Sequence, residues 1–161
     1  MFIVRAIRRS GGTNINKLYY GMYTMWPNTT VVSSLFFLTN VHHLSYKQHP
    51  YYKISFIILT TSSLLYHSFR DVILFYYFDQ LAVYNIILLG GYEYYKYINS
   101  EPKNIYTTSS IINVLSFGAV IMLYFYGYCT RENTTCDYQD TCHSILHAIT
   151  SIGHHAIINM L

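Results

Sequence analysis

Residues 51–94 read YYKISFIILTTSSLLYHSFRDVILFYYFDQLAVYNIILLGGYEY, which is two long apolar runs joined by one charged turn. The runs extend from about Tyr52 to Ser68 and from about Val72 to Tyr94, and Arg70-Asp71 forms the turn. A membrane span needs about 20 mostly apolar residues, and each run is close to that length. Helices joined by so short a link must be antiparallel neighbours. The stretch therefore predicts a helical hairpin that crosses a membrane twice.

The rest of the chain continues this pattern. Of its 161 residues, 52% are hydrophobic and only 11% are charged, which is far from the balance of soluble domains. Further apolar runs extend from about Trp26 to Ser45, from about Ile105 to Tyr128 and from about Cys142 to Leu161. The sequence thus predicts an all-α fold, a polytopic transmembrane bundle of about five spanning helices in residues 25–161. We expect a multi-pass protein of an endomembrane or the plasma membrane.

Residues 1–24 form a separate basic segment, which is typical of a short interfacial helix. The other charges lie between the apolar runs, as in multispanning proteins, so the net charge of +3 does not indicate nucleic-acid binding. The membrane orientation stays open, because a small excess of Lys and Arg favours a cytoplasmic N-terminus whereas two sequons, at Asn28 and Asn133, favour the opposite. A disulfide also stays open among the three cysteines, Cys129, Cys136 and Cys142.

Ionisable side chains inside the predicted spans mark the candidate site. An aspartate at the centre of a span costs about 2.5–3.5 kcal/mol, so Asp79 needs a reason to be there. His67 ends the second run, and His143 and His147 begin the last one. Residues four apart lie about 40° apart around a helix, so Ser63 shares a face with His67, and His143 with His147.

The order of the runs brings these residues to one membrane face. The end of the second run, the start of the third and the start of the fifth must lie at similar depth if each run crosses the membrane once. Three neutral imidazoles and a water form an open zinc site, and nitrogen ligands without thiolates favour zinc, with iron and copper as open alternatives. The sequence therefore predicts Zn²⁺ bound by His67, His143 and His147.

The remaining polar residues receive ordinary interpretations. His154 shares the stripe of His143 and His147 but lies about 10 Å along the helix from His147, too far to bind the same ion. Asp71 is expected to form a surface pair with Arg70. Interfacial or hydrogen-bonding roles are expected for His42, His43 and His49, and structural or second-site roles for His154 and His155.

The candidate residues also resemble a known family. The stretch Ser62-Ser63-Leu64-Leu65-Tyr66-His67, then Phe78-Asp79-Gln80-Leu81-Ala82, then His143-x3-His147, is similar to the CREST-type superfamily. That group joins alkaline ceramidases, progestin and adipoQ receptors, Per1-like lipid-remodelling proteins and the myomaker group. The resemblance implies that the three histidines hold zinc and that Ser63 and Asp79 lie beside the metal-bound water. The family fold has seven spans, so this chain would be a shortened version.

We therefore expect a zinc-dependent, ceramidase-like hydrolase of lipid amide or ester bonds, with an activated water as the nucleophile. Asp79 would orient or deprotonate that water, and Ser63 would donate a hydrogen bond to it or to the developing oxyanion. The partners would be the bilayer and a lipid substrate, with no nucleic acid. Two alternatives stay open: a non-catalytic zinc-containing receptor or scaffold, and a b-type haem protein.

Overall fold

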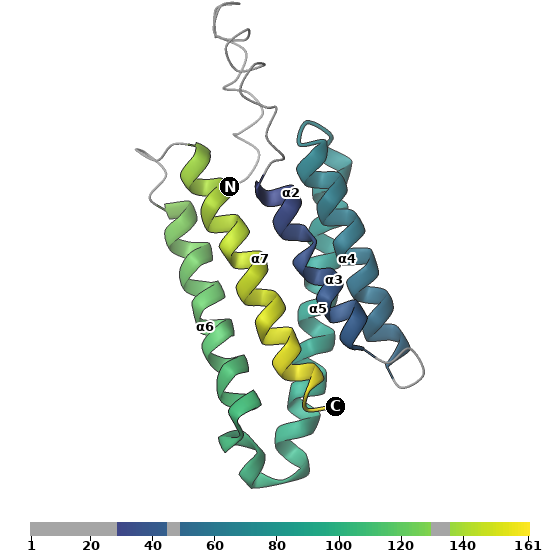
Figure 1. The fold of residues 1–161 in the computed structure, drawn as a ribbon, viewed down its shortest axis with the longest axis vertical. Helices are drawn as coiled ribbons and strands as arrows, with labels where there is room; N and C mark the ends of the chain where they lie inside the picture. The colour runs from purple at the N-terminus through teal and green to yellow at the C-terminus, as the bar shows by residue number, and fades with distance from the viewer. Residues whose placement is uncertain (1–28, 45–48, 130–135) are drawn as a thin grey trace, which may run out of the picture.

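Helices that run up and down one long axis make up the protein (Figure 1). The computed structural model describes residues 29–44, 49–129 and 136–161, and all regular structure within them is helical. The elements are α2 (Thr29–Ser34), α3 (Phe36–His43), α4 (Pro50–Ser68), α5 (Ile73–Ser100), the 3₁₀ helix η2 (Pro102–Tyr106), α6 (Thr108–Cys129) and α7 (Cys136–Ile158). The all-α prediction is confirmed for these residues. The basic segment predicted at 1–24 and both sequons lie outside them.

Helix α7 occupies the middle of the bundle. It packs against α6 on one side and against α2 and α3 on the other, while α4 packs against α3 and α5. Helices α5 and α6 are linked through η2 at one end, where Tyr94 Oη also lies 2.8 Å from Ser110 Oγ, but their backbones do not pack closely together. The contacts among α2, α3, α4 and α7 therefore form the centre of the bundle. Helix α6 packs on the outside, against α7.

Chain direction alternates along the bundle. In Figure 1 the start of α2, the turn between α4 and α5 and the start of α7 lie at the same end. The end of α3, the link between α5 and α6 and the C-terminus lie toward the other. This arrangement brings His67, at the end of α4, to the same end as His143, near the start of α7.

Two helices are long and apolar enough to cross a membrane, α5 over Ile73–Ser100 and α6 over Thr108–Phe125. The other predicted spans are less apolar or broken: α4 and α7 carry many hydroxyl and imidazole groups, and the first run is interrupted at Leu35 between α2 and α3. Length and composition thus support two of the five predicted spans.

The interior of the bundle is unusually polar. Ser34, Asn40 and Ser62 are completely buried, whereas Leu88 and Leu115 are 73% and 66% exposed. The buried hydroxyls are tolerated because many of them donate to the carbonyl three or four residues earlier in their own helix, as Ser34 does to Thr30 O at 2.8 Å. Apolar side chains therefore cover much of the outside, and small polar side chains fill much of the inside.

The end of α5 and the start of α7 lie at different residues from the bounds of the apolar runs in the sequence. Helix α5 continues past Tyr94 to Ser100, and it stops because Glu101 is extended ahead of Pro102, as the residue before a proline prefers. Helix α7 begins at Cys136, before the apolar run at Cys142. Cys142 is a free thiol, and the side chains of Cys129 and Cys136 lie outside the described residues, so the disulfide prediction is not tested.

Candidate metal centre

Three imidazoles meet at the end of the bundle where α4 finishes and α7 starts. The ring centroids of His67 and His143 are 4.8 Å apart, those of His67 and His147 are 5.3 Å apart, and those of His143 and His147 are 4.6 Å apart. One ligand nitrogen from each ring lies within 4.8 Å of the other two. Within the described residues, this is the group of at least three metal-ligating side chains that could hold an ion.

A hydroxyl of helix α2 forms a hydrogen bond with one of the three imidazoles. Ser33 Oγ lies 2.9 Å from His147 Nδ1, and the same hydroxyl donates its proton to Thr30 O at 3.0 Å. When the single proton of this hydroxyl is on Thr30 O, Ser33 accepts from His147 and Nδ1 of His147 carries the hydrogen; this is the tautomer that we assign. The lone pair of the neutral ring is then on Nε2. A metal-ligating histidine is commonly oriented by such a bond to its other nitrogen.

His67 supplies a second observation. The side chain is 5% exposed, and its Nε2 is buried without any hydrogen-bond partner in the described chain. Buried polar atoms are nearly always satisfied, because an unpaired one costs about 1–3 kcal/mol. Coordination of a cation would satisfy this nitrogen. The three histidines therefore fit a metal that prefers imidazole ligands.

No family model, curated protein or solved structure matches this chain. The resemblance to the CREST-type superfamily consequently stays a prediction, and the chemistry of the site follows from its own residues.

Asp79 is buried but is not part of the three-histidine group. It lies on α5, is 4% exposed and accepts a hydrogen bond from Ser62 Oγ at 3.3 Å. The Ser62 hydroxyl also points at Leu59 O, at 3.0 Å, so its one proton is divided between two acceptors. The Asp79 carboxyl is therefore only weakly satisfied and retains capacity for a water or a substrate group.

The Ser63 hydroxyl forms a hydrogen bond with α2. Its hydroxyl lies 3.0 Å from Ser34 Oγ, and Ser34 has already donated its proton to Thr30 O. With the Ser34 proton on Thr30 O, Ser63 is the donor in this pair. The donation to an oxyanion that the sequence predicts would require Ser63 to exchange this bond.

Arg70 does not form the surface pair predicted with Asp71. Its guanidinium instead lies 3.0 Å from a carboxylate oxygen of Asp140 on α7 and donates to Thr30 Oγ1 at 2.7 Å. Asp71 was predicted as the partner because it is the nearest carboxylate in the sequence. Folding instead brings the start of α7, with Asp140, against the turn between α4 and α5. The bond ties three elements together one helical turn before His143.

The other histidines lie elsewhere. His154 is buried and bonds Tyr52 Oη through Nδ1 at 2.6 Å, and it is not part of the metal-ligating group, as its axial distance from His147 predicts. His42 is exposed. His43 lies against His155 at the far end of the bundle.

The role of the α2 hydroxyls was not predicted from the sequence. Thr30, Ser33 and Ser34 are spaced so that they share one helical face, and that spacing was the available signal. Their partners on α4 and α7 are distant in the sequence, and short hydroxyl-rich stretches are common in this chain. Packing was needed to show which histidine they hold.

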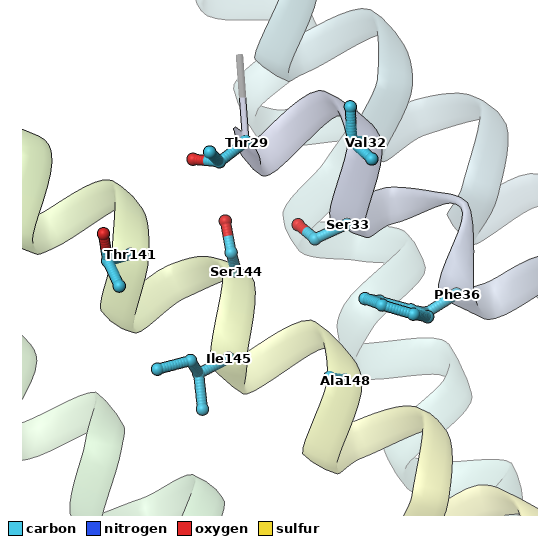
Figure 2. Close-up of a pocket in the computed structure, with 8 residues that line it drawn as sticks. All are labelled: Thr29, Val32, Ser33, Phe36, Thr141, Ser144, Ile145 and Ala148. Atoms are coloured by element: carbon cyan, nitrogen blue, oxygen red, sulfur yellow. The ribbon is translucent and has the colours of Figure 1, made fainter. Parts of the chain in front are cut away.

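A groove adjoins the centre on its outer side. It lies between α2, the start of α3 and α7, has a volume of about 400 Å³ and includes Ser33 in its wall (Figure 2). Its other lining residues are Thr29, Val32, Phe36, Thr141, Ser144, Ile145 and Ala148. Figure 2 shows the side chains of Thr29, Ser33, Thr141 and Ser144 near Val32, with Phe36, Ile145 and Ala148 further along the groove. The groove is thus mostly apolar with a few hydroxyls, and it lies one side chain away from His147.

Proposed function

We propose that this chain is a multi-pass membrane protein that binds Zn²⁺ through His67, His143 and His147 and hydrolyses an amide or ester bond of a lipid. The observation that carries the proposal is the convergence of three imidazoles in which Nε2 of His147 is freed by Ser33 and Nε2 of His67 is buried without a partner. Three nitrogens without a thiolate favour zinc.

The membrane part of the proposal is supported by the distribution of side chains. Helices α5 and α6 satisfy the length and hydropathy of a span, and their apolar side chains point outward. Small and hydroxylated residues at helix contacts, such as Ser34, Ser62 and Ser63, are typical of bundles that pack in lipid. We extend the spans to α2 with α3, α4 and α7, in which the polar side chains of Ser34, Asn40 and Ser62 are buried inside the bundle.

The chemistry divides between the ion and the protein. Zinc, when bound, supplies Lewis-acid activation of water and of a carbonyl oxygen. Asp79 would accept the proton of the attacking water, since its carboxyl is buried and weakly satisfied. Ser33 holds the His147 ring in one orientation. The groove beside Ser33, which is mostly apolar, would hold an acyl chain, and its few hydroxyls would lie near the polar linkage.

Metal content tests the proposal most directly. Wild type, His67→Ala and His147→Ala are purified in detergent, and zinc is measured by elemental analysis alongside release of fatty acid from a fluorescent short-chain ceramide and a matching ester lipid. We expect one tightly held zinc per chain in wild type, and loss of both zinc and hydrolysis in the two variants. His42→Ala, which removes an exposed histidine, should change neither. Hydrolysis by metal-free protein would contradict the proposal.

A non-catalytic zinc receptor or scaffold is the second candidate. It is favoured by the bonds that Ser63 and Asp79 make to Ser34 and Ser62, which hold both groups within helix packing. Asp79→Asn separates the two functions. In a hydrolase this variant should lose at least about 100-fold in rate, the usual scale of acid–base catalysis, while keeping its zinc. A zinc-loaded wild type without turnover of either lipid would favour the scaffold.

The geometry does not favour a haem at these histidines. Two axial imidazoles must face each other across the porphyrin plane. The three rings here lie within 5.3 Å of one another and are tilted edge to face, which leaves no room for a flat macrocycle between any two of them.

A further inference from the structure

A second pair of imidazoles lies at the opposite end of α7. Nδ1 of His43, the last residue of α3, is 2.9 Å from Nδ1 of His155. The ring centroids are 5.2 Å apart. His43 is exposed and His155 is partly exposed, so solvent can reach the pair.

Thr39 determines which His155 nitrogen has a free lone pair. Thr39 Oγ1 donates its proton to Phe36 O at 2.6 Å and lies 2.8 Å from His155 Nε2. With its single hydroxyl proton on Phe36 O, Thr39 accepts from Nε2–H of His155, and this is the tautomer that we assign. The neighbouring Ser151 hydroxyl also donates to Phe36 O, at 3.0 Å, so it offers no replacement proton. The lone pair of neutral His155 is therefore on Nδ1, directed at His43.

We propose that His43 and His155 form a second site for a divalent transition-metal ion of the kind that prefers imidazole, such as Zn²⁺ or Cu²⁺. Nδ1 of each ring is the ligand atom, and Thr39 is a positioning residue. Two nitrogens on one tetrahedral zinc lie about 3.3 Å apart, given Zn–N bonds of about 2.0–2.1 Å, so the pair has to open by a few tenths of an ångström. Exposed His43 can make that movement. Water would complete the coordination, and two protein ligands make this site weaker than the three-histidine centre.

The experiment counts metal ions at equilibrium. Full-length protein in detergent is dialysed against increasing Zn²⁺, and bound zinc per chain is measured. We expect two ions in wild type, the second appearing at higher concentration, and only the tighter one in His43→Ala and His155→Ala. His42→Ala, the neighbouring exposed histidine, should still bind two. His147→Ala should lose the tighter ion and keep the weaker one, so the two proposals fail separately.

A different result would overturn the second site. If wild type saturates at one ion, or if His43→Ala still binds two, the rings only share a hydrogen bond in which His43 is the donor. If His42→Ala loses the weaker ion, the ligands are misassigned.

Two further variants separate metal binding from folding. His43→Cys replaces one ligand by another, and it should restore the second ion and, with Co²⁺ as the probe, give a thiolate-to-cobalt charge-transfer band. Thr39→Val removes the bond to His155 at nearly constant volume and should weaken the second ion about 10-fold, within the 10–100-fold range of outer-shell residues. An unchanged affinity in Thr39→Val, or no cobalt band in folded His43→Cys, would contradict the assignment.

Discussion

Hydroxyl groups of α2 and α3 are bonded to two histidines of α7, and the position of each hydroxyl proton is linked to which ring nitrogen carries the lone pair. Ser33 and Thr39 each donate to the carbonyl three residues earlier and accept from a histidine of α7. Ser33 thereby holds His147, and Thr39 holds His155. Because α2, α3 and α7 run in the same direction (Figure 1), the two contacts follow one another down the bundle in sequence order. The same local arrangement, a hydroxyl bonded both to its own helix and to a histidine of α7, thus occurs at both ends of the bundle and leaves the other ring nitrogen with the lone pair.

Removing the Ser33 hydroxyl should weaken zinc binding without removing a ligand. Ser33→Ala loses the acceptor for His147 Nδ1–H, and the expected loss of zinc affinity is about 10–100-fold, measured by competition with a chromogenic chelator. Ser144→Ala is the matched control, because that hydroxyl lines the same groove but, among the described residues, donates to Asp140 O of its own helix and does not contact a histidine nitrogen. Equal affinities in wild type and Ser33→Ala would show that Ser33 does not position a ligand.

Some residue-scale features follow from the sequence and others do not. The spacing of His143 and His147, with His67 at the end of an earlier run, was sufficient to predict their convergence. The partner of Arg70 was not predictable, because Asp71 is adjacent in the sequence while Asp140 becomes close only when α7 packs against the turn. The role of Ser33 likewise depends on a contact between residues that are far apart in the chain.

At the scale of helices, Gly90 of α5 lies directly against side chains of α4 and α7. A Cβ at this position would lie 2.8 Å from His154 Cε1 and 3.1 Å from Tyr52 Oη, whereas a Cβ at Gly91 would meet nothing within 4 Å. His154 cannot easily move aside, because it is buried and bonded to Tyr52 at 2.6 Å. The absence of a side chain at Gly90 therefore leaves the space that His154 and Tyr52 occupy where the three helices pack together.

This contrast gives a pair of matched variants. Gly90→Ala should destabilise the protein by about 1–2 kcal/mol, since overpacking costs about 1–3 kcal/mol and better helix propensity returns up to about 1 kcal/mol. Gly91→Ala should be neutral or stabilising by up to about 1 kcal/mol. Thermal unfolding in detergent, followed by circular dichroism, measures both. A Gly90→Ala melting temperature at or above that of Gly91→Ala would show that the helices do not pack as described.

Helices were easier to predict than their ends. Apolar runs indicate the part of a helix that can lie in lipid, and the helix itself may extend beyond that part into polar residues. Helix α7 therefore starts at Cys136, within a polar stretch, and α5 continues until Glu101 and Pro102 stop it. The break at Leu35 between α2 and α3 has no proline or glycine to announce it.

At the scale of the whole molecule, the three-histidine centre depends on the alternating directions of the helices. His67 and the start of α7 share one end because α5 and α6, which lie between them in the chain, run in opposite directions (Figure 1). An even number of crossings returns the chain to the same face. If α5 and α6 both span the membrane, the three-histidine centre lies near one face, and the His43–His155 pair lies near the other.

Chemical labelling tests this arrangement. Asp71 is exposed in the turn before α5, and Lys103 is exposed in η2 after it. In a variant with all three cysteines replaced by serine, Asp71→Cys and Lys103→Cys are introduced one at a time and treated with a membrane-impermeant maleimide in sealed vesicles. If α5 spans, one position should be labelled in intact vesicles and the other only after permeabilisation, because some 28 helical residues at about 1.5 Å each exceed the hydrocarbon thickness of about 30 Å. Labelling of both positions in intact vesicles would show that α5 does not cross, and the two histidine clusters would then lie on the same side.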